Sequence, residues 1–229
     1  MTGKVTRCCS GMGEFAIARH KMVESQVRPN GVTNGALLAA MLDLPRERFI
    51  PAERSAMAYV DEDIPLGHGR YVMEPMVLAR LLQVAEVRAE DVALDVGCAT
   101  GYASALLARL CTTVVALDSD HRLATRATAV LTELGADNVV VVEGPLAAGY
   151  PRQAPYDVIL INGAVAAVPD AVLGQLAEGG RLVTVVRRDG GVGRGTLFIR
   201  SAGVCSRRAV FDAATPVLPG FEVERRFVF

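Results

Sequence analysis

The stretch Asp95–Tyr102, which reads Asp-Val-Gly-Cys-Ala-Thr-Gly-Tyr, decides the fold of this chain. It joins an apolar run, Val92–Val96, to a segment with helical periodicity, Tyr102–Leu110. A strand, a glycine turn and a helix in this order are typical of an open α/β sheet, which binds ligands at the carboxyl ends of its strands. Gly97 and Gly101 allow a tight turn and a close approach to a ligand. Their Gly-x-x-x-Gly spacing differs from the Gly-x-Gly-x-x-Gly of a dinucleotide site.

Two acids accompany this loop and suggest what it binds. Asp95 ends the first predicted strand, and an acid there suits an ammonium group or a hydrogen-bonding loop. Asp118 ends the next predicted strand, Thr113–Leu117, where it is placed to accept hydrogen bonds from the two hydroxyls of a ribose. The pair is typical of S-adenosylmethionine binding in Rossmann-like methyltransferases, so we predict a nucleoside-type ligand. The alternative is a structural turn in which Asp95 caps the following backbone.

The segments that follow repeat the strand–helix pattern. Asn138–Val142 and Val158–Ile161 are nearly continuous in apolar residues, which is typical of parallel strands covered by helices on both faces. An amphipathic helix is expected over residues 123–134, between an acidic cap and Gly135. Later strands are expected at Arg181–Val186, Thr196–Arg200, Arg207–Phe211 and Phe221–Phe229.

The prediction is therefore a mostly parallel, doubly wound α/β sheet of Rossmann-like form, with a helical N-terminal cap and a β-rich C-terminal end. Residues 1–13 lack periodicity and are expected to be a loose tail. Residues 14–229 form a single domain in this prediction. Within it, 14–88 supply the helical cap and the substrate loop, and 89–229 supply the cofactor-binding core and the C-terminal strands.

Composition excludes several classes of protein. The 229 residues carry 24 Lys and Arg against 25 Asp and Glu, a net charge of −1, which argues against a nucleic-acid partner. The mean hydropathy is +0.31, yet no apolar window reaches the roughly 18 residues that a membrane span needs. The five cysteines and three histidines lack metal-ligand spacing, and the N-terminus lacks a secretory signal. We therefore expect a cytoplasmic protein with reduced thiols, no metal and no membrane contact.

From about Met22 to Val186 the sequence resembles the protein-L-isoaspartate O-methyltransferases. The matching stretches are Met22–Gln26, Ala39–Met41, Pro45–Pro51, Ala58–Asp61, Ile64–Gly67, Leu94–Tyr102, Ala154–Asp157 and Gln175–Gly180. The resemblance implies the class I methyltransferase fold and S-adenosyl-L-methionine as the cofactor, with S-adenosyl-L-homocysteine as its product. It also implies methylation of the isoaspartyl carboxylate of damaged proteins. The resulting ester closes to a succinimide that opens partly to normal aspartate.

The substrate loop departs from the pattern of that family. Where the family usually reads Gly-Gln-Thr-Ile-Ser before a proline, this chain has Gly69–Glu74 ahead of Pro75. Met73 stands in place of the serine that orients the substrate carboxylate, and its thioether donates no hydrogen bond. Arg70 is a candidate replacement, because a guanidinium binds a carboxylate bidentately, although it also suits a solvated loop. Tyr71 is expected either to donate a hydrogen bond or to wall the pocket.

The cofactor loops depart as well. Ala99 replaces the middle glycine of the turn beside Cys98, a change that is costly only if φ is positive there. The family's Gly-Asp-Gly, whose aspartate binds the adenine amine, reads Gly144–Leu146 with Pro145 in the middle. Glu143 is the candidate substitute for that aspartate, unless it points to solvent.

A carboxylate nucleophile needs no general base, because its pKa near 4 leaves it ionised at neutral pH. Catalysis then depends on alignment and on exclusion of water. The departures leave two other hypotheses open: a diverged methyltransferase acting on another carboxylate, or a cofactor-binding interaction module without strong catalysis. The sequence leaves the choice between monomer and homodimer open.

Overall fold

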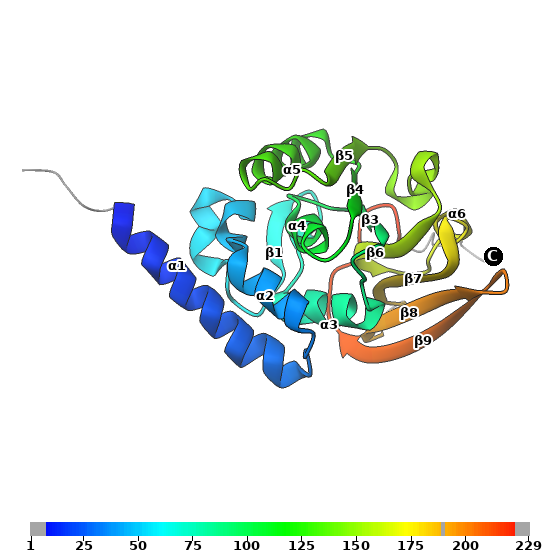
Figure 1. Ribbon diagram of the computed structural model, residues 1–229, viewed down its shortest axis with the longest axis horizontal. Coiled ribbons are helices and arrows are strands. Elements are labelled where there is room, and N and C mark those ends of the chain that lie inside the picture. Colours follow the sequence, from blue (N-terminus) through cyan, green and yellow to red (C-terminus); the bar gives the residue numbers. More distant parts are fainter. Residues whose placement is uncertain (1–7, 189–190, 223–229) are drawn as a thin grey trace, which may run out of the picture.

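The computed structural model describes residues 8–188 and 191–222. These residues form a seven-stranded sheet in the order β5-β4-β3-β6-β7-β8-β9 (Figure 1). The strands are β3 (Val92–Val96), β4 (Thr113–Asp118), β5 (Val139–Glu143), β6 (Tyr156–Val165), β7 (Leu176–Val186), β8 (Gly193–Ser201) and β9 (Val204–Ala213). The first five are parallel, and β8 and β9 add antiparallel pairs at one edge. The predicted Rossmann-like fold is confirmed.

The strand order reverses between β3 and β6, so the carboxyl end of β3 lies at a topological switch point. Side chains alternate across the sheet, and each face has its own core. One core joins the strands to the N-terminal helices and to α3 (Pro75–Ala85), α4 (Tyr102–Ala108) and α5 (His121–Glu133). The other joins them to α6 (Asp170–Leu173) and to the chain after β9. The glycine loop after β3 thus sits where open sheets bind ligands.

The N-terminal cap is helical, as predicted, but it begins earlier. Helix α1 covers Cys8–Met22 and continues through a π-helical turn, Val23–Val27, and a 3-10 turn, Arg28–Asn30. The loose tail predicted over residues 1–13 is therefore wrong for 8–13, while 1–7 lie outside the described residues. Glycine costs a helix only about 1 kcal/mol relative to alanine, and no proline interrupts this stretch. Helix α2 (Gly35–Asp43) follows, and the Asn34 side chain caps it.

The segment before residue 71, which leads into the substrate loop and for which the sequence predicts no strand, contains a hairpin. Strands β1 (Ile64–Gly67) and β2 (Arg70–Val72) pair antiparallel around the turn Gly67-His68-Gly69. All three turn residues have positive φ, between 51° and 92°, which glycine adopts easily. The three-residue strand β2 is too short to give a recognisable alternation, yet it turns Arg70 into the protein.

The strand predicted over Phe221–Phe229 is not seen at its start, because Phe221 and Glu222 are not in a strand; 223–229 lie outside the described residues. Leu218–Phe221 form a turn, with the Phe221 amide donating to the Leu218 carbonyl at 3.1 Å and Gly220 at φ 87°. Glycine at the third position suits the positive φ of a type II turn, and proline at the second position is common in such turns. The turn lies near the carboxyl ends of β3 and β6, where the chain after β9 returns to the sheet (red, Figure 1).

In the described part of the chain, no helix is long and apolar enough to cross a membrane.

Candidate functional site

The glycine loop is held against the neighbouring strand by its backbone. The amides of Gly97 and Cys98 both donate to the Leu117 carbonyl, at 2.8 and 3.0 Å. Gly97 and Gly101 have φ of 80° and 94°, in the left-handed region that glycine tolerates best. A Cβ on Gly101 would lie 3.1 Å from the Leu131 side chain. Both glycines are thus required by the turn itself.

Asp95 offers a buried acceptor beside this turn. Its side chain is fully buried, and its Oδ2 accepts a 2.6 Å hydrogen bond from the Ser104 hydroxyl. Its Oδ1 has no hydrogen-bond partner among the residues that the structure describes. Burial, together with the nearby Asp118 carboxylate, raises the pKa of Asp95 to about 7. A positively charged group at Oδ1 would satisfy this atom and favour the ionised acid.

Asp118 lies fully buried at the end of β4, and its two carboxylate oxygens already accept hydrogen bonds from protein donors. Its Oδ1 accepts from Arg70 Nη1 at 2.6 Å and from the Asp120 amide at 2.9 Å. Its Oδ2 accepts from Arg70 Nη2 and from the Ala99 amide, both at 2.8 Å. A carboxylate has about four acceptor positions. In the described structure all four are taken, and none is left for a ribose.

Arg70 and Asp118 thus form a buried bidentate ion pair, with side chains 3% and 0% exposed. From the sequence the two residues were expected to have separate roles, Arg70 toward the substrate carboxylate and Asp118 toward the ribose. Their contact could not be predicted, because the two residues lie 48 positions apart and the hairpin that turns Arg70 toward Asp118 was not expected. Both roles stay predictions, and both require this pair to open.

The space above the glycine loop is filled by protein side chains. A Cβ added to Gly97 would lie 3.2 Å from Arg70 Nη2 and 3.3 Å from Leu218 Cδ1. One added to Gly163 would overlap the Leu218 side chain. Two cavities remain there, each of about 10 Å³, room for a single water molecule. Ligand pockets usually measure roughly 300 Å³ or more, so the arrangement must open to admit a nucleoside.

The remaining substrate-loop residues line these two small cavities. Tyr71 and Met73 border both of them, together with Asn162, and Thr100 borders one. The Thr100 hydroxyl is buried and finds no partner within the described residues. Met73 is 2% exposed, so the position occupied by a serine in the resembled family here supplies an apolar wall.

Arg46 holds the backbone of Met73 in place, a role that the sequence did not predict. Its fully buried guanidinium donates to the Met73 carbonyl at 2.8 Å and to the Ala58 carbonyl at 2.7 Å. It also lies 4.6 Å from the centre of the Tyr102 ring. Arg46 stands in the charged run Arg-Glu-Arg, which is typical of a solvated surface, so the sequence carried no signal of its burial.

Ala99 has a positive φ of 53°, the conformation in which alanine in place of glycine costs conformational energy. We expect Ala99→Gly to raise the free energy of unfolding by roughly 0.5–1 kcal/mol, because it relieves left-handed strain while adding entropy to the unfolded chain. Ala105→Gly is the matched control: it is also buried but lies within helix α4, and it should destabilise by about 1 kcal/mol. Urea denaturation measures both, and a loss of stability in Ala99→Gly would contradict the prediction.

The residues predicted to meet the adenine follow β5. Glu143 pairs with Asp118 in the sheet register, but its half-exposed carboxylate contacts His121 Nδ1 at 2.7 Å. Gly144 donates its amide to the Asp118 carbonyl at 3.0 Å, and Pro145 precedes a short 3-10 turn. Leu146 is buried in the same core as Leu218. The structure brings this group to the edge of the site, and their ligand contacts stay predictions.

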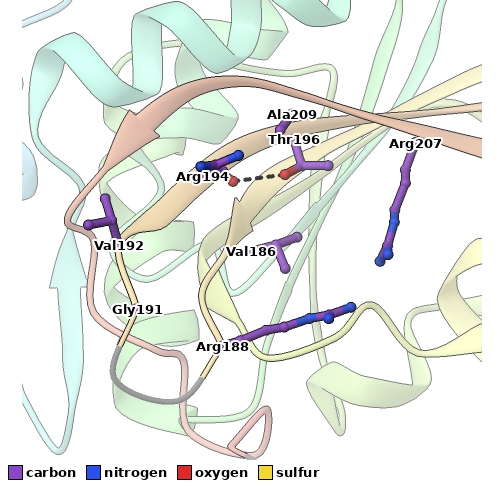
Figure 2. A pocket seen from close by; sticks show the side chains of 8 residues that line it. All are labelled: Val186, Arg188, Gly191, Val192, Arg194, Thr196, Arg207 and Ala209. Carbon is purple, nitrogen blue, oxygen red and sulfur yellow. Dashed lines mark hydrogen bonds between the residues drawn. The ribbon is translucent and has the colours of Figure 1, made fainter.

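A separate cavity of about 380 Å³ lies on the antiparallel part of the sheet (Figure 2). Its lining consists of Val186, Arg188, Gly191, Val192, Arg194, Thr196, Arg207 and Ala209. Arg194 comes from β8 and Arg207 from β9, while Thr196 is occupied by a 2.8 Å hydrogen bond to the Arg194 carbonyl. Among the described residues, this lining includes none of the glycine loop or the substrate loop, so we place the site at the end of β3.

Within residues 8–188 and 191–222, no group of three or more His, Cys, Asp or Glu side chains is arranged to hold a metal ion. Cys98 is buried, and burial raises the pKa of its thiol well above the usual range. Its place in the site is therefore that of a small apolar residue.

Comparison with known proteins identifies the family of this chain. The chain matches the family described as protein-L-isoaspartate(D-aspartate) O-methyltransferase over residues 18–197. It is 39% identical over 172 residues to a protein-L-isoaspartate O-methyltransferase from Koribacter versatilis, covering 75% of this chain and 78% of that protein. It is 41% identical over 175 residues to the protein of the same name from Methylorubrum populi, covering 76% and 82%.

Solved structures agree on the fold. A structure named protein-L-isoaspartate O-methyltransferase superposes with a TM-score of 0.76 at 24% identity, covering 88% of this chain and 66% of that one. A second, described as a putative protein of this kind from Plasmodium falciparum in complex with S-adenosyl-L-homocysteine, gives 0.74 at 17% identity, covering 89% and 97%. Because the family match covers residues 18–197 and the relatives are 39% and 41% identical over most of both chains, this chain belongs to the protein-L-isoaspartate(D-aspartate) O-methyltransferase family.

Proposed function

We propose that this chain is an S-adenosylmethionine-dependent methyltransferase that acts on the isoaspartyl carboxylate of damaged proteins. The observation that carries the proposal is the Asp95 Oδ1 atom, buried beside a positive-φ glycine turn and without a partner in the described residues, in a member of this family. Such an atom calls for a donor that a ligand brings. Family membership supplies the reaction and the substrate class.

The residues of the loop fit the cofactor in chemistry. Asp95 would receive its ammonium group, and Gly97–Gly101 would let its chain lie against the backbone. Asp118 would take the ribose hydroxyls once Arg70 leaves, Glu143 the adenine amine, and Leu146 one face of the base. When bound, the cofactor supplies an electrophilic methyl group on a sulfonium that leaves as a neutral thioether.

The protein has no proton to move in this reaction, because the substrate carboxylate is ionised at neutral pH. Its task is to align the nucleophile and to exclude water. Tyr71 and Met73 line the space next to the glycine loop, and the apolar Met73 side chain helps to exclude water there. The buried Thr100 hydroxyl, with no partner in the described part of the chain, is a donor that can orient the substrate carboxylate.

The expected activity is tested with a pair of peptides that differ only in an isoaspartyl or a normal aspartyl linkage. We expect labelled methyl to enter the isoaspartyl peptide selectively, because the family acts on that linkage. Background labelling of both peptides would contradict the proposal. Labelling of both to the same high level would instead indicate a methyltransferase for other carboxylates.

The substrate loop gives a sharper test with the same assay. We expect Arg70→Ala to lower kcat/KM on the isoaspartyl peptide by about 10–100-fold, the effect of losing one or two orienting hydrogen bonds. Met73→Ser should cost less, because it removes only apolar contact and returns a donor. If Arg70→Ala matches the wild type, Arg70 does not bind the substrate carboxylate.

We also propose that the protein works in the cytoplasm, where thiols stay reduced. Cys98, Cys111 and Cys205 are free thiols, and the first two are buried.

A further inference from the structure

We propose that Arg70 is a carboxylate switch that couples the two ligands of this enzyme. In the closed arrangement it holds Asp118; when ribose hydroxyls displace it, it turns to the isoaspartyl carboxylate of the substrate. The inference rests on the proposed function for the identity of the second carboxylate. It adds an order of binding, nucleoside first and peptide second, and an internal competitor for the nucleoside.

The hydrogen bonds of Asp118 divide into two kinds. Each carboxylate oxygen receives one backbone donor from its own neighbourhood, the Asp120 amide on Oδ1 and the Ala99 amide on Oδ2. Each also receives one donor from Arg70, Nη1 on Oδ1 and Nη2 on Oδ2. A ribose diol carries two hydroxyl donors on adjacent carbons, so it can replace the two guanidinium donors one for one while the backbone donors stay.

The ion pair itself adds little net stability, because both charges are taken out of water to form it, although removing one partner alone is costly. An exchange of partners at Asp118, in which neither residue is left without hydrogen bonds, avoids that cost. The pairing of Arg70 is also incomplete, because its buried Nε has no partner within the described residues. Arg70 sits on the two-stranded hairpin, outside the seven-stranded sheet, next to a turn with three positive-φ residues. Ligand hydroxyls therefore compete for Asp118 with a partner whose own hydrogen bonding is incomplete and which lies on a short hairpin outside the main sheet.

Leu218 closes the same space from the other side. It lies against the positions that Cβ atoms of Gly97 and Gly163 would occupy. Backbone hydrogen bonds join its segment to the end of β6. The Ala164 amide donates to the Pro216 carbonyl at 2.9 Å, and the Leu218 amide donates to the Ala164 carbonyl at 2.8 Å. Just after β6, the Ala166 amide donates to the Phe221 carbonyl at 3.2 Å. Entry of the nucleoside thus moves two short segments, the hairpin and this turn, while the sheet stays intact.

Once displaced, Arg70 needs another anion, since an unpaired buried cation is costly. The isoaspartyl carboxylate is planar and matches the guanidinium fork. Tyr71 and Met73, on the same short segment, already line the space next to Cys98 and Ala99. The nucleoside therefore prepares the peptide site, and by reciprocity the peptide strengthens nucleoside binding by the same factor.

The first test is calorimetric titration with S-adenosyl-L-homocysteine, without peptide. We expect Arg70→Gln to bind it at least about tenfold more tightly than the wild type, because the competitor for Asp118 is gone. Equal or weaker binding by Arg70→Gln, or no binding by either protein, would overturn the switch. Circular dichroism verifies that each variant is folded.

A second variant keeps the ion pair and removes the apolar cover. Leu218→Ala should also tighten S-adenosyl-L-homocysteine binding, by several-fold, since the space over Gly97 is vacated. Leu197→Ala is the matched control: it is 5% exposed against 4% for Leu218, but it belongs to the other core. Tightening by both variants, or by neither, would contradict the role of Leu218.

The coupling is measured with the isoaspartyl peptide. For the wild type we expect about tenfold tighter peptide binding when S-adenosyl-L-homocysteine is saturating, a coupling that Arg70→Gln should abolish. The same coupling in both proteins would overturn the second half of the switch. Failure of the proposed function gives a different result, because the wild type would then methylate no isoaspartyl peptide. The titrations with S-adenosyl-L-homocysteine would still test whether the nucleoside displaces Arg70 from Asp118.

Discussion

Arg181→Ala is expected to lower the free energy of unfolding by about 3–5 kcal/mol, because it leaves a buried carboxylate without its partner. Arg181, in β7, donates to Asp91 Oδ2 at 2.6 Å, and the two side chains are 11% and 4% exposed. It also donates to the carbonyls of Ala85 and Glu86 at the end of α3, at 3.0 and 2.9 Å. One guanidinium thus joins β7, the end of α3 and the start of β3, which carries the glycine loop.

The matched control is Arg194→Ala. Arg194 faces Asp212 at 3.6 Å, with side chains 65% and 73% exposed, so its loss should cost less than about 1 kcal/mol. Urea denaturation of both variants gives the comparison. Similar losses in the two proteins would show that the Arg181 network carries no special stability. Arg181→Lys should recover only part of the loss, since an ammonium lacks the fork that reaches both Asp91 and the helix end.

Binding of S-adenosyl-L-homocysteine is expected to weaken about tenfold between pH 8 and pH 6, because Asp95 must be ionised to receive the ammonium group. Burial raises the pKa of Asp95 to about 7, so the acid loses its charge across this interval. The groups around it are the Ser104 hydroxyl, the Asp118 carboxylate, the Asn162 amide, the Arg70 guanidinium and the Cys98 thiol. Calorimetry at a series of pH values measures the slope, and a flat profile would contradict the assignment.

Asp95→Asn is the control for this titration, because the amide resembles the protonated acid. Its binding should be weak and independent of pH over the same interval. Stability gives a second readout. The folded protein with its raised Asp95 pKa binds more protons than the unfolded chain between about pH 4 and 7, so wild-type stability falls as pH rises through that window.

Asp95→Asn removes this contribution, and the variant should gain stability relative to the wild type as pH rises. Burial also raises the pKa of Glu74 to about 7, but Glu74 titrates in both proteins and its effect cancels in the difference. A constant difference in stability from pH 5 to 8 would indicate an ordinary pKa for Asp95.

The sequence anticipated the elements whose local signals agree with one another. The apolar runs at Val92–Val96 and Val158–Ile161 became parallel strands because continuous burial on both faces requires apolar residues at every position. The Asp120 cap and the stripe of α5 were read from their spacing alone. Glycine signals were equally direct, since the turn of Gly97 and Gly101 needs the φ values that only glycine adopts easily.

Other elements carried no local signal. Strand β2 is three residues long, and the turn at Leu218–Phe221 interrupts what was expected to be a final strand from Phe221. The burial of Arg46, Arg70 and Arg181 could not be predicted from the sequence, because arginine is usually exposed. Their burial depends on acceptors that other segments bring: backbone carbonyls for Arg46, and carboxylates 48 and 90 residues away for Arg70 and Arg181.

By itself, the sequence determined the Rossmann-like sheet, the place of the glycine loop and the family, because periodicity, glycine spacing and family motifs are local properties of the chain. Only the tertiary structure decided how the two charged site residues are used. Arg70 and Asp118 bind each other in the closed arrangement, with Leu218 beside them over Gly97. A buried charge is stable only beside an opposite charge or polar partners. Which partner it has depends on the packing of segments that are distant in the chain, and not on its sequence neighbours.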